Sequence, residues 1–427
     1  MEKTSLISGF YKLPLEDRLR MVSGFAGLTE EESALLKAEG SLPLHLAERM
    51  IENVVGFMPL PLGIAVNFLV NGKPYMVPMA LEEPSVVAAA SHAAKMAAVR
   101  GGFQAETSDP IMIGQIQVVN VKEPFKASRR ILAEKEAVLD LANSVDPVLV
   151  KLGGGAKGLE VKILSSFRGP MLVVELYVDC RDAMGANAVN SMAEAVAPLV
   201  ERLAEGRIRL RIISNLADRR LARASVVMDR ETVGEDVVEG VLDAYAFAVS
   251  DPYRAATHNK GIMNGIVAVA LATGNDTRAL EAGAHTYAAR SGRYQPLTRW
   301  EKDGEGNLVG SIELPIAVGV VGGATASHPI AQICRKILGV KTARELAEVM
   351  AAVGLAQNFA ALRALATEGI QRGHMELHAR NVAIMAGAKG ELIDLVAEKM
   401  VEERKIRLDR AQEILEETRK EKPKIGA

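Results

Sequence analysis

The chain has 427 residues, with 51 basic and 53 acidic side chains and a net charge of −2 at pH 7. This length can bury a large core over two or three domains, and so small a charge provides no field for attracting nucleic acid or anionic lipid. Two cysteines, Cys180 and Cys334, exclude a disulfide framework and a cysteine-rich zinc site. The N-terminal segment lacks an apolar stretch of signal-peptide length, and no window has the roughly 18 uninterrupted apolar residues of a membrane span. We therefore expect a cytoplasmic protein that binds neither nucleic acid nor a membrane.

Two short amphipathic patterns in residues 13–50 predict an N-terminal helical arm, and a capping box from Thr29 to Glu32 marks the start of the second helix. Residues 52–80 contain alternating apolar runs on both sides of Asn71-Gly72, which predicts a β-hairpin with a two-residue turn.

An alanine-rich pattern at residues 85–100 predicts a helix that begins just after Pro84, and Glu82 and Glu83 precede it. Carboxylates at a helix N-terminus commonly complement the helix dipole. A purely structural role is therefore one interpretation of these glutamates, and a role in catalysis is the other.

From residue 111 the pattern changes to strands that alternate with amphipathic helices. The order is strand, helix, strand, strand, helix, strand, at residues 111–121, 127–144, 159–167, 170–180, 186–205 and 208–216. This order predicts a ferredoxin-like βαββαβ domain, an antiparallel sheet with helices on one face, inserted into a larger, mostly helical domain. The fold class is therefore α+β.

Two glycine-containing motifs lie in this insertion. Gly153, Gly155 and Gly158 form a literal GxGxxG, but they follow a helix and precede a strand, the reverse of the dinucleotide-binding order, so we interpret them as a loop. The better anion site is DAMGAN at 182–187, where a strand ends and a helix begins, because small residues let the backbone approach a phosphate. The alternative is an ordinary strand-to-helix turn capped by Asp182.

Polar side chains gather at both ends of an apolar helix pattern at residues 262–273. They are Arg254, His258, Asn259, Lys260, Gly274, Asn275 and Asp276. Lys260 and Asp276 can meet in one cleft only through the fold. An exposed lysine and an N-cap aspartate on separate surface loops are the alternative.

The C-terminal third contains two further candidate regions. Glycines at 319–329 either meet a ligand or make a tight turn. His374 and His378 would share one helix face and could bind zinc, but Met375 stands where a metalloprotease has glutamate, so we predict no metal site. Because histidine titrates near neutral pH, His374 in a mobile C-terminal unit is the better candidate for a proton donor.

Several of these stretches together resemble the ordered motifs of 3-hydroxy-3-methylglutaryl-coenzyme A (HMG-CoA) reductase, in its soluble bacterial class II form. The motifs are ENVVG from Glu52, LEEPSVVAAAS from Leu81, DAMGAN from Asp182, RAATHNKGIMNG from Arg254, ATGND from Ala272, GVVGGAT from Gly319 and ATEGIQRGHM from Ala366. The resemblance covers nearly the whole chain. The eukaryotic class reads DKK, DAMGMN and GTVGGGT where this chain has HNK, DAMGAN and GVVGGAT, so the active loop lacks a second lysine.

The resemblance implies reduction of the HMG-CoA thioester to mevalonate and free CoA by two hydrides from nicotinamide cofactors, or the reverse reaction in some bacteria. By motif match the catalytic residues are Glu83, Lys260, Asp276 and His374. Lys260 would stabilise the oxyanion formed by the first hydride, and His374 would protonate the departing CoA thiolate. Glu83 would protonate the final alkoxide, and Asp276 would hold Lys260 and Glu83 in one network.

The resemblance also implies binding residues. Arg254 would hold the free carboxylate of the substrate, helped by Ser85, Thr257 and Asn264. The cofactor contacts would be Asp146, Asp182, Ala183, Met184, Gly185, Ala186 and Asn187. A carboxylate accepts a hydrogen bond from a ribose 2′-hydroxyl and repels a 2′-phosphate, so Asp146 predicts NADH over NADPH.

The expected organisation is a large domain from residues 1–109 and 218–370 with the HMG-CoA site, an inserted cofactor domain at 110–217, and a mobile flap at 371–427. The family's site lies between subunits, so at least a homodimer is expected. Two other functions remain as alternatives: a different acyl-CoA or aldehyde dehydrogenase on the same scaffold, and a non-catalytic small-ligand binding protein whose polar clusters are caps and salt bridges.

Overall fold

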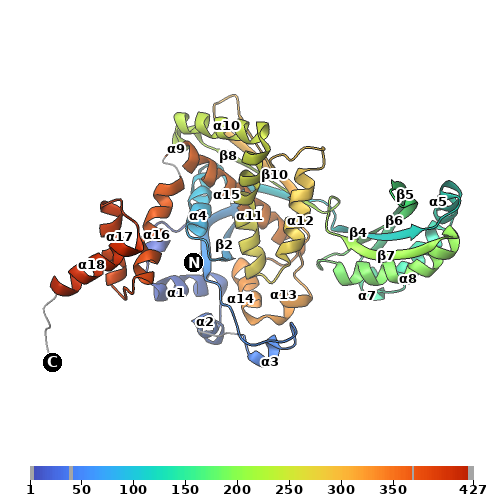
Figure 1. The fold of residues 1–427 in the computed structure, drawn as a ribbon, viewed down its shortest axis with the longest axis horizontal. Coiled ribbons are helices and arrows are strands. Elements are labelled where there is room, and N and C mark those ends of the chain that lie inside the picture. The colour runs from blue at the N-terminus through green and yellow to red at the C-terminus, as the bar shows by residue number, and fades with distance from the viewer. Residues whose placement is uncertain (1–3, 38–41, 368–369, 422–427) are drawn as a thin grey trace.

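The computed structural model describes residues 4–37, 42–367 and 370–421, apart from the side chains of residues 370–377 and 419–421. A central body carries a four-stranded sheet with its helices at one end of the long axis and three helices, α16 to α18, at the other (Figure 1). The N-terminal elements are the 3-10 helix η1 (Phe10–Lys12) and helices α1 (Leu15–Ala26), α2 (Glu30–Lys37) and α3 (Leu44–Ala47). The predicted capping box opens α2, since Thr29 and Glu32 exchange backbone-to-side-chain hydrogen bonds of 2.8 and 3.2 Å.

A six-stranded sheet with the order β2-β1-β3-β8-β10-β9 crosses the central body. Its strands are β1 (Leu62–Val70), β2 (Lys73–Ala80), β3 (Phe103–Thr107), β8 (Leu221–Met228), β9 (Thr298–Lys302) and β10 (Leu308–Pro315). The predicted hairpin is confirmed, because Val70 pairs with Lys73 and both turn residues, Asn71 and Gly72, have positive φ. Strands β3 and β8, which the sequence did not predict, join this hairpin to the β9–β10 hairpin. The large domain therefore contains more sheet than expected.

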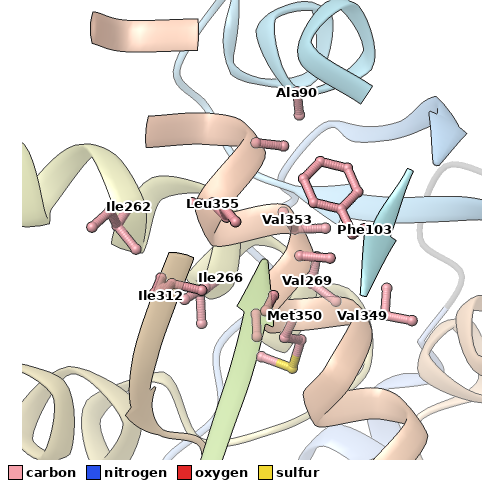
Figure 2. Packing of buried hydrophobic residues seen from close by; sticks show 14 of the residues in the cluster. Ala90, Phe103, Ile262, Ile266, Val269, Ile312, Val349, Met350, Val353 and Leu355 are labelled. Carbon is pink, nitrogen blue, oxygen red and sulfur yellow. The ribbon is translucent and has the colours of Figure 1, made fainter. Parts of the chain in front are cut away.

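Two helices, α11 and α15, lie at the centre of this body, and the other helices surround them. The helices of the body are α4 (Val86–Ala97), η2 (Ala98–Arg100), α9 (Arg230–Val233), α10 (Glu235–Ser250), α11 (Pro252–Ala272), α12 (Thr277–Ala288), α13 (Gly323–Ser327), α14 (Pro329–Leu338) and α15 (Ala343–Ala366). Figure 2 shows Ile262 and Ile266 of α11 in the same packed layer as Met350 and Val353 of α15. The two helices approach closely because Gly265 has no side chain; a Cβ there would lie 2.9 Å from a Val353 methyl carbon.

Among the described residues, α15 is the one helix long and apolar enough to cross a membrane by length and composition. In this fold 67% of its most apolar window is buried. It packs against α11, α4 and α10 and against strands β8 and β3. The apolar composition of α15 is therefore accounted for by its place at the centre of the body.

The inserted segment contains β4 (Ile111–Val119), α5 (Pro124–Ala133), α6 (Lys135–Asn143), α7 (Pro147–Lys151), β5 (Gly155–Ser166), β6 (Gly169–Asp179), α8 (Ala186–Ala204) and β7 (Arg207–Ser214). Its sheet has the order β5-β6-β4-β7 with antiparallel neighbours, and the element order is the predicted one. Two details differ from prediction. The helix expected at 127–144 is divided into α5 and α6 at Glu134, and Gly155 and Gly158 lie in strand β5, not in a loop.

The C-terminal helices are α16 (Ile370–Met385), α17 (Leu392–Glu402) and α18 (Leu408–Glu421). They bury a small core of their own, which includes Val396, Met400 and Ile414. This core is separate from the large cluster around α11 and α15 and from the cluster of the inserted segment.

Candidate active site

A cavity of about 1040 Å³ opens beside α4, α11, α15 and η1. Six predicted site residues line it: Glu83, Ser85, Arg254, Thr257, Lys260 and Asn264. A second cavity of about 1020 Å³ lies over the polar face of the six-stranded sheet and contains none of the predicted residues. The chemistry expected from the sequence is therefore concentrated in the first cavity.

One face of α11 supplies most of this cavity. Arg254, Thr257, Lys260 and Asn264 follow one another at helical spacing and line the same wall. Residues 254–260 were expected to precede the helix, but α11 begins at Pro252, where Asp251 accepts a hydrogen bond from the Tyr253 amide. The longer helix places the cationic side chains on a rigid element.

Lys260 and Glu83 form the charged centre of the cavity. Lys260 Nζ donates to Glu83 Oε2 at 2.7 Å, and Asn264 Nδ2 donates to the same oxygen at 3.3 Å. The Lys260 side chain is 59% exposed and that of Glu83 is 35% exposed. The Glu83 carboxylate therefore has a direct partner in the cavity, which the helix-dipole interpretation did not require.

Ser85 lies two residues after Glu83 and Arg254 lies six residues before Lys260, and both line the same cavity. Ser85 has φ 72°, a left-handed conformation that is uncommon outside glycine and costs of order 1–3 kcal/mol. Its side chain makes no cap hydrogen bond to α4. Burial lowers the pKa of the Arg254 guanidinium from its ordinary value, but an arginine remains charged at neutral pH. A planar cation and a hydroxyl thus face the space beside Glu83 and Lys260.

The opposite face of α11 is fixed by a buried polar network that sequence reasoning did not assign. His258 Nε2 lies 2.7 Å from Thr298 Oγ1 and 3.1 Å from Asn358 Nδ2, and Trp300 Nε1 donates to Asn358 Oδ1 at 2.8 Å. Burial, with a smaller effect from Arg254, lowers the pKa of His258 to about 3. The ring is therefore neutral at physiological pH.

Asn259 continues this attachment. Its side chain donates to Gln295 O and accepts from Leu297 N, both at 2.9 Å. A rotation of α11 would break these bonds together with those of His258. The network thereby fixes the direction in which Lys260 points.

Asp276 lies outside the cavity that contains Lys260 and Glu83. Its carboxylate caps α12 by accepting from the amides of Arg278 and Ala279 at 2.9 and 3.2 Å. The 12 steps along α11 from Lys260 to Ala272 alone rise about 18 Å, and Asp276 is not among the residues that line the cavity. The expected network of Asp276 with Lys260 and Glu83 therefore does not form within one chain.

Asp276 instead adjoins the loop predicted to bind the cofactor. Gly319 N donates to the side chain of Asn275 at 2.8 Å, and Val320 N donates to Asp182 O at 2.9 Å. Three motifs far apart in sequence, ATGND, GVVGGAT and DAMGAN, thus meet. We call residues 182–187, 274–276 and 319–320 the cofactor half-site, and the six residues that line the cavity the substrate half-site.

The DAMGAN segment, Asp182, Ala183, Met184, Gly185, Ala186 and Asn187, leads into α8. Asp182 does not cap α8; its carboxylate accepts from Ala343 N, the first amide of α15, at 2.8 Å. Gly185 precedes α8 with φ 111°, and a Cβ there would lie 2.4 Å from Cys180 Sγ. A 19-residue helix that starts with small residues and no side-chain cap is suited to an anionic diphosphate.

The other predicted residues have the following positions. Asp146 caps α7, its Oδ1 accepting from Leu149 N at 2.9 Å, and it is partly exposed. The backbone of α16 includes position 374, but the His374 side chain lies outside the described residues. Arg380 of the same helix lines the cavity, so α16 reaches it. Within the described residues there is no group of three or more His, Cys, Asp and Glu side chains placed to hold a metal ion.

The family model of hydroxymethylglutaryl-coenzyme A reductase matches residues 14–379. The chain belongs to the HMG-CoA reductase family. It is 61% identical to the HMG-CoA reductase of Archaeoglobus fulgidus over 417 residues, 97% of this chain and 95% of the relative. It is 36% identical to a probable HMG-CoA reductase of Borreliella burgdorferi, over 82% of this chain and 81% of that one.

Solved HMG-CoA reductases from Streptococcus pneumoniae have the same fold. One superposes with a TM-score of 0.83 at 42% identity, covering 96% of this chain and 99% of the other. A second, described as a class II enzyme bound to NADPH in open conformations, has a TM-score of 0.81 at 42% identity, covering 95% and 100%. The recognition of a class II HMG-CoA reductase from sequence motifs is confirmed, as is the α+β fold.

Proposed function

We propose that this chain interconverts HMG-CoA with mevalonate and free CoA, using NAD(H) in two successive hydride transfers, at sites shared by two subunits in the cytoplasm. The observation that carries the proposal is the Glu83–Lys260 pair in a cavity that also contains Arg254. Both directions use the same groups, so the supply of substrates sets the physiological direction.

The separation of the two half-sites supports an assembly of at least two subunits. A two-fold axis can bring the substrate half-site of one subunit against the cofactor half-site of the other, and it does so twice. In such a dimer the partner subunit's Asp276 would join Lys260 and Glu83. The segment that carries ENVVG is rich in exposed apolar side chains, among them Ile51, Val55 and Met58, and an exposed apolar patch of this kind is typical of a protein interface.

Substrate binding follows from the polar groups of the cavity. The Arg254 guanidinium matches the two oxygens of the free HMG carboxylate, and Ser85, Thr257 and Asn264 offer further hydrogen bonds. This orientation places the thioester carbonyl toward Lys260. Residues 182–187 would hold the reduced nicotinamide, which when bound would supply the hydride. The Lys260 ammonium stabilises the negative charge that develops on the carbonyl oxygen, and the partner subunit strengthens this effect by excluding water.

Two proton transfers complete the reaction. When mevaldyl-CoA collapses, the carbon–sulfur bond breaks and CoA leaves as a thiolate, which His374 protonates. Helix α16 is suited to this role because Arg380, six residues further along, lines the cavity. The remaining mevaldehyde accepts a second hydride at its carbonyl carbon. Glu83, protonated from solvent before this step, then donates that proton to the alkoxide oxygen to give mevalonate.

The proposed preference for NADH rests on Asp146. The carboxylate caps α7 through one oxygen, which leaves the other able to accept from a ribose 2′-hydroxyl, whereas a 2′-phosphate would meet like charge. A S. pneumoniae relative was solved with NADPH, so both cofactors are compared. We expect a higher kcat/KM for NADH, and a higher value for NADPH would reject the assignment to Asp146.

The test of function follows the absorbance of reduced nicotinamide. We expect HMG-CoA to consume two equivalents of NADH and to release CoA, and mevalonate with CoA and NAD to run the reverse reaction. Other acyl-CoA thioesters serve as the comparison. A higher kcat/KM for one of them, or HMG-CoA binding without any turnover, would reject the proposal in favour of another dehydrogenase or a binding protein.

A further inference from the structure

Arg220 is a buried arginine at the point where the chain returns from the inserted segment to the central body. It is only 5% exposed. No salt bridge joins it to a carboxylate in the part of the chain that the structure describes. Burying a charge is costly unless its hydrogen-bonding groups are satisfied. The contacts of Arg220 therefore indicate the role of its buried charge.

The guanidinium of Arg220 donates to three backbone carbonyls. Its Nη1 donates to Ala183 O and to Met184 O, both at 3.0 Å, and its Nη2 donates to Val318 O at 2.5 Å. The first two carbonyls belong to DAMGAN and the third precedes Gly319. Arg220 therefore joins the DAMGAN segment to the residue that precedes the 319–320 segment of the cofactor half-site.

These bonds fix the orientation of two consecutive peptide groups. In a planar trans peptide the carbonyl and the following amide point in opposite directions. Because the Ala183 and Met184 carbonyls face Arg220, the amide groups of Met184 and Gly185 point away from it. The carbonyl dipoles of the loop are thus turned toward the buried cation, and the amide ends of the same peptides are turned away from it.

A second contact depends on the same arrangement. A Cβ on Gly319 would lie 2.6 Å from Met184 N, so the glycine loop can pack on this peptide only without a side chain. Gly319 N of the same loop donates a hydrogen bond to the side chain of Asn275, next to Asp276. Displacing the Ala183–Met184 peptide would therefore disturb both the cofactor loop and the segment that carries Asp276.

We propose that Arg220 is a positioning residue for cofactor binding, which holds residues 183–185 with the amides of Met184 and Gly185 directed toward the cofactor diphosphate and adds a fixed positive charge behind them. This inference rests on the proposed function only in assigning residues 182–187 to the cofactor. Burial lowers the pKa of Arg220 relative to free arginine, and Asp179 and Asp182 nearby favour the charged form.

The test compares Arg220→Gln and Arg220→Lys with a neighbouring control, Arg219→Gln. Arg219 is exposed, lies over the Tyr177 ring and pairs with Glu160, so it has the same chemistry without the buried carbonyls. NADH affinity is measured by fluorescence titration, HMG-CoA affinity by calorimetry, and kcat and KM by steady-state assay, all on the full-length assembled protein.

We expect Arg220→Gln to weaken NADH binding about tenfold or more while HMG-CoA affinity stays within about twofold of wild type. Arg220→Lys keeps the charge but loses the planar fork, so its NADH affinity should lie between those of wild type and Arg220→Gln. The NADH affinity of Arg219→Gln should match that of wild type. NADH affinity within about twofold of wild type in Arg220→Gln would overturn the inference. An equal loss of NADH and HMG-CoA affinity would also overturn it, because a general structural defect acts on both ligands.

If Arg220→Gln fails to fold, Arg220→Lys is judged by the same two ligand affinities. Failure of the proposed function is visible separately. In that case wild-type protein would not oxidise NADH with HMG-CoA, whereas failure of the Arg220 inference leaves wild type active and NADH binding unchanged in the variants.

Discussion

Lys260 donates a 2.7 Å hydrogen bond to Glu83, although 177 positions separate the two residues in the chain. The pair forms because the β1–β2 hairpin brings the start of α4 beside the middle of α11. Its neighbours in the cavity are an arginine, Arg254, and an amide, Asn264, which also contacts Glu83. The cation that would hold an oxyanion and the acid that would protonate it thus lie side by side.

Removing the charge of Lys260 should affect turnover more than binding. In Lys260→Met we expect kcat to fall by about 10²–10³-fold, because the cation acts where charge develops, with a much smaller change in the KM for HMG-CoA. Steady-state kinetics measure both quantities. Lys126→Met, which removes a surface ion pair with Glu123, is the control. A variant with raised KM and unchanged kcat would mean that Lys260 only binds substrate.

His374→Gln should separate the two halves of the reaction. Loss of the proton donor should block CoA release from HMG-CoA, whereas added mevaldehyde should still be reduced, since that step needs no departing thiolate. The two rates are measured with the same enzyme preparation. His378→Gln, an exposed residue one helical turn away, should change neither. Equal loss of both rates in His374→Gln would reject the assigned role.

His258 should make the protein sensitive to acid. Its pKa is lowered to about 3 in the fold from an ordinary value of 6.5, so below pH 6.5 the unfolded chain binds a proton that the folded chain does not. Stability is therefore fully present above pH 6.5 and is lost as the pH falls toward 3. Between pH 7 and 4.5 this residue alone should account for about 2 to 3 kcal/mol of the loss in the free energy of unfolding.

Denaturant titrations of wild type and His258→Gln at the two pH values measure this contribution. The variant should lose about 2 to 3 kcal/mol less than wild type on acidification, whatever its stability at pH 7. His45→Gln, an exposed position, is the control. An identical pH dependence in His258→Gln and wild type would show that the ring is not held neutral.

Gly185 should be required for both folding and cofactor binding. Its φ of 111° and the 2.4 Å approach of a Cβ to Cys180 Sγ disfavour any side chain. We expect Gly185→Ala to destabilise the protein by about 1–2 kcal/mol or more and to raise the KM for NADH. Thermal unfolding and kinetics report the two effects. Gly304→Ala, where a Cβ meets nothing within 4 Å, should be neutral; an equally neutral Gly185→Ala would contradict the close packing.

Local chemistry made much of this fold predictable. The Asn71-Gly72 turn, the capping box at Thr29 and the βαββαβ order all follow from short-range preferences, and the structure has each of them. Strands β3 and β8 were missed because both make their main pairings with residues far away in sequence. The start of α11 was placed too late, although Asp251 followed by Pro252 is a helix N-terminus signal that could have located it.

Six of the predicted site residues line one cavity, but the arrangement of the predicted residues was not predictable from the sequence. Motifs identified Lys260 and Asp276, and periodicity predicted a helix between them, but neither shows that this helix keeps the two residues in separate half-sites. Arg220 was missed because nothing in its neighbouring residues distinguishes it from the exposed Arg219. Only the burial of its guanidinium against three carbonyls does so.

Subunit complementation tests the shared-site account most directly. Lys260→Met alters the substrate half-site and Asp276→Asn alters the cofactor half-site, so each variant alone should be nearly inactive. After random mixing and reassembly, half of the dimers contain one subunit of each kind and one intact site, so HMG-CoA-dependent NADH oxidation should return to about a quarter of the wild-type rate. No recovery, with mixed dimers demonstrated by mass spectrometry, would contradict a site built from two subunits.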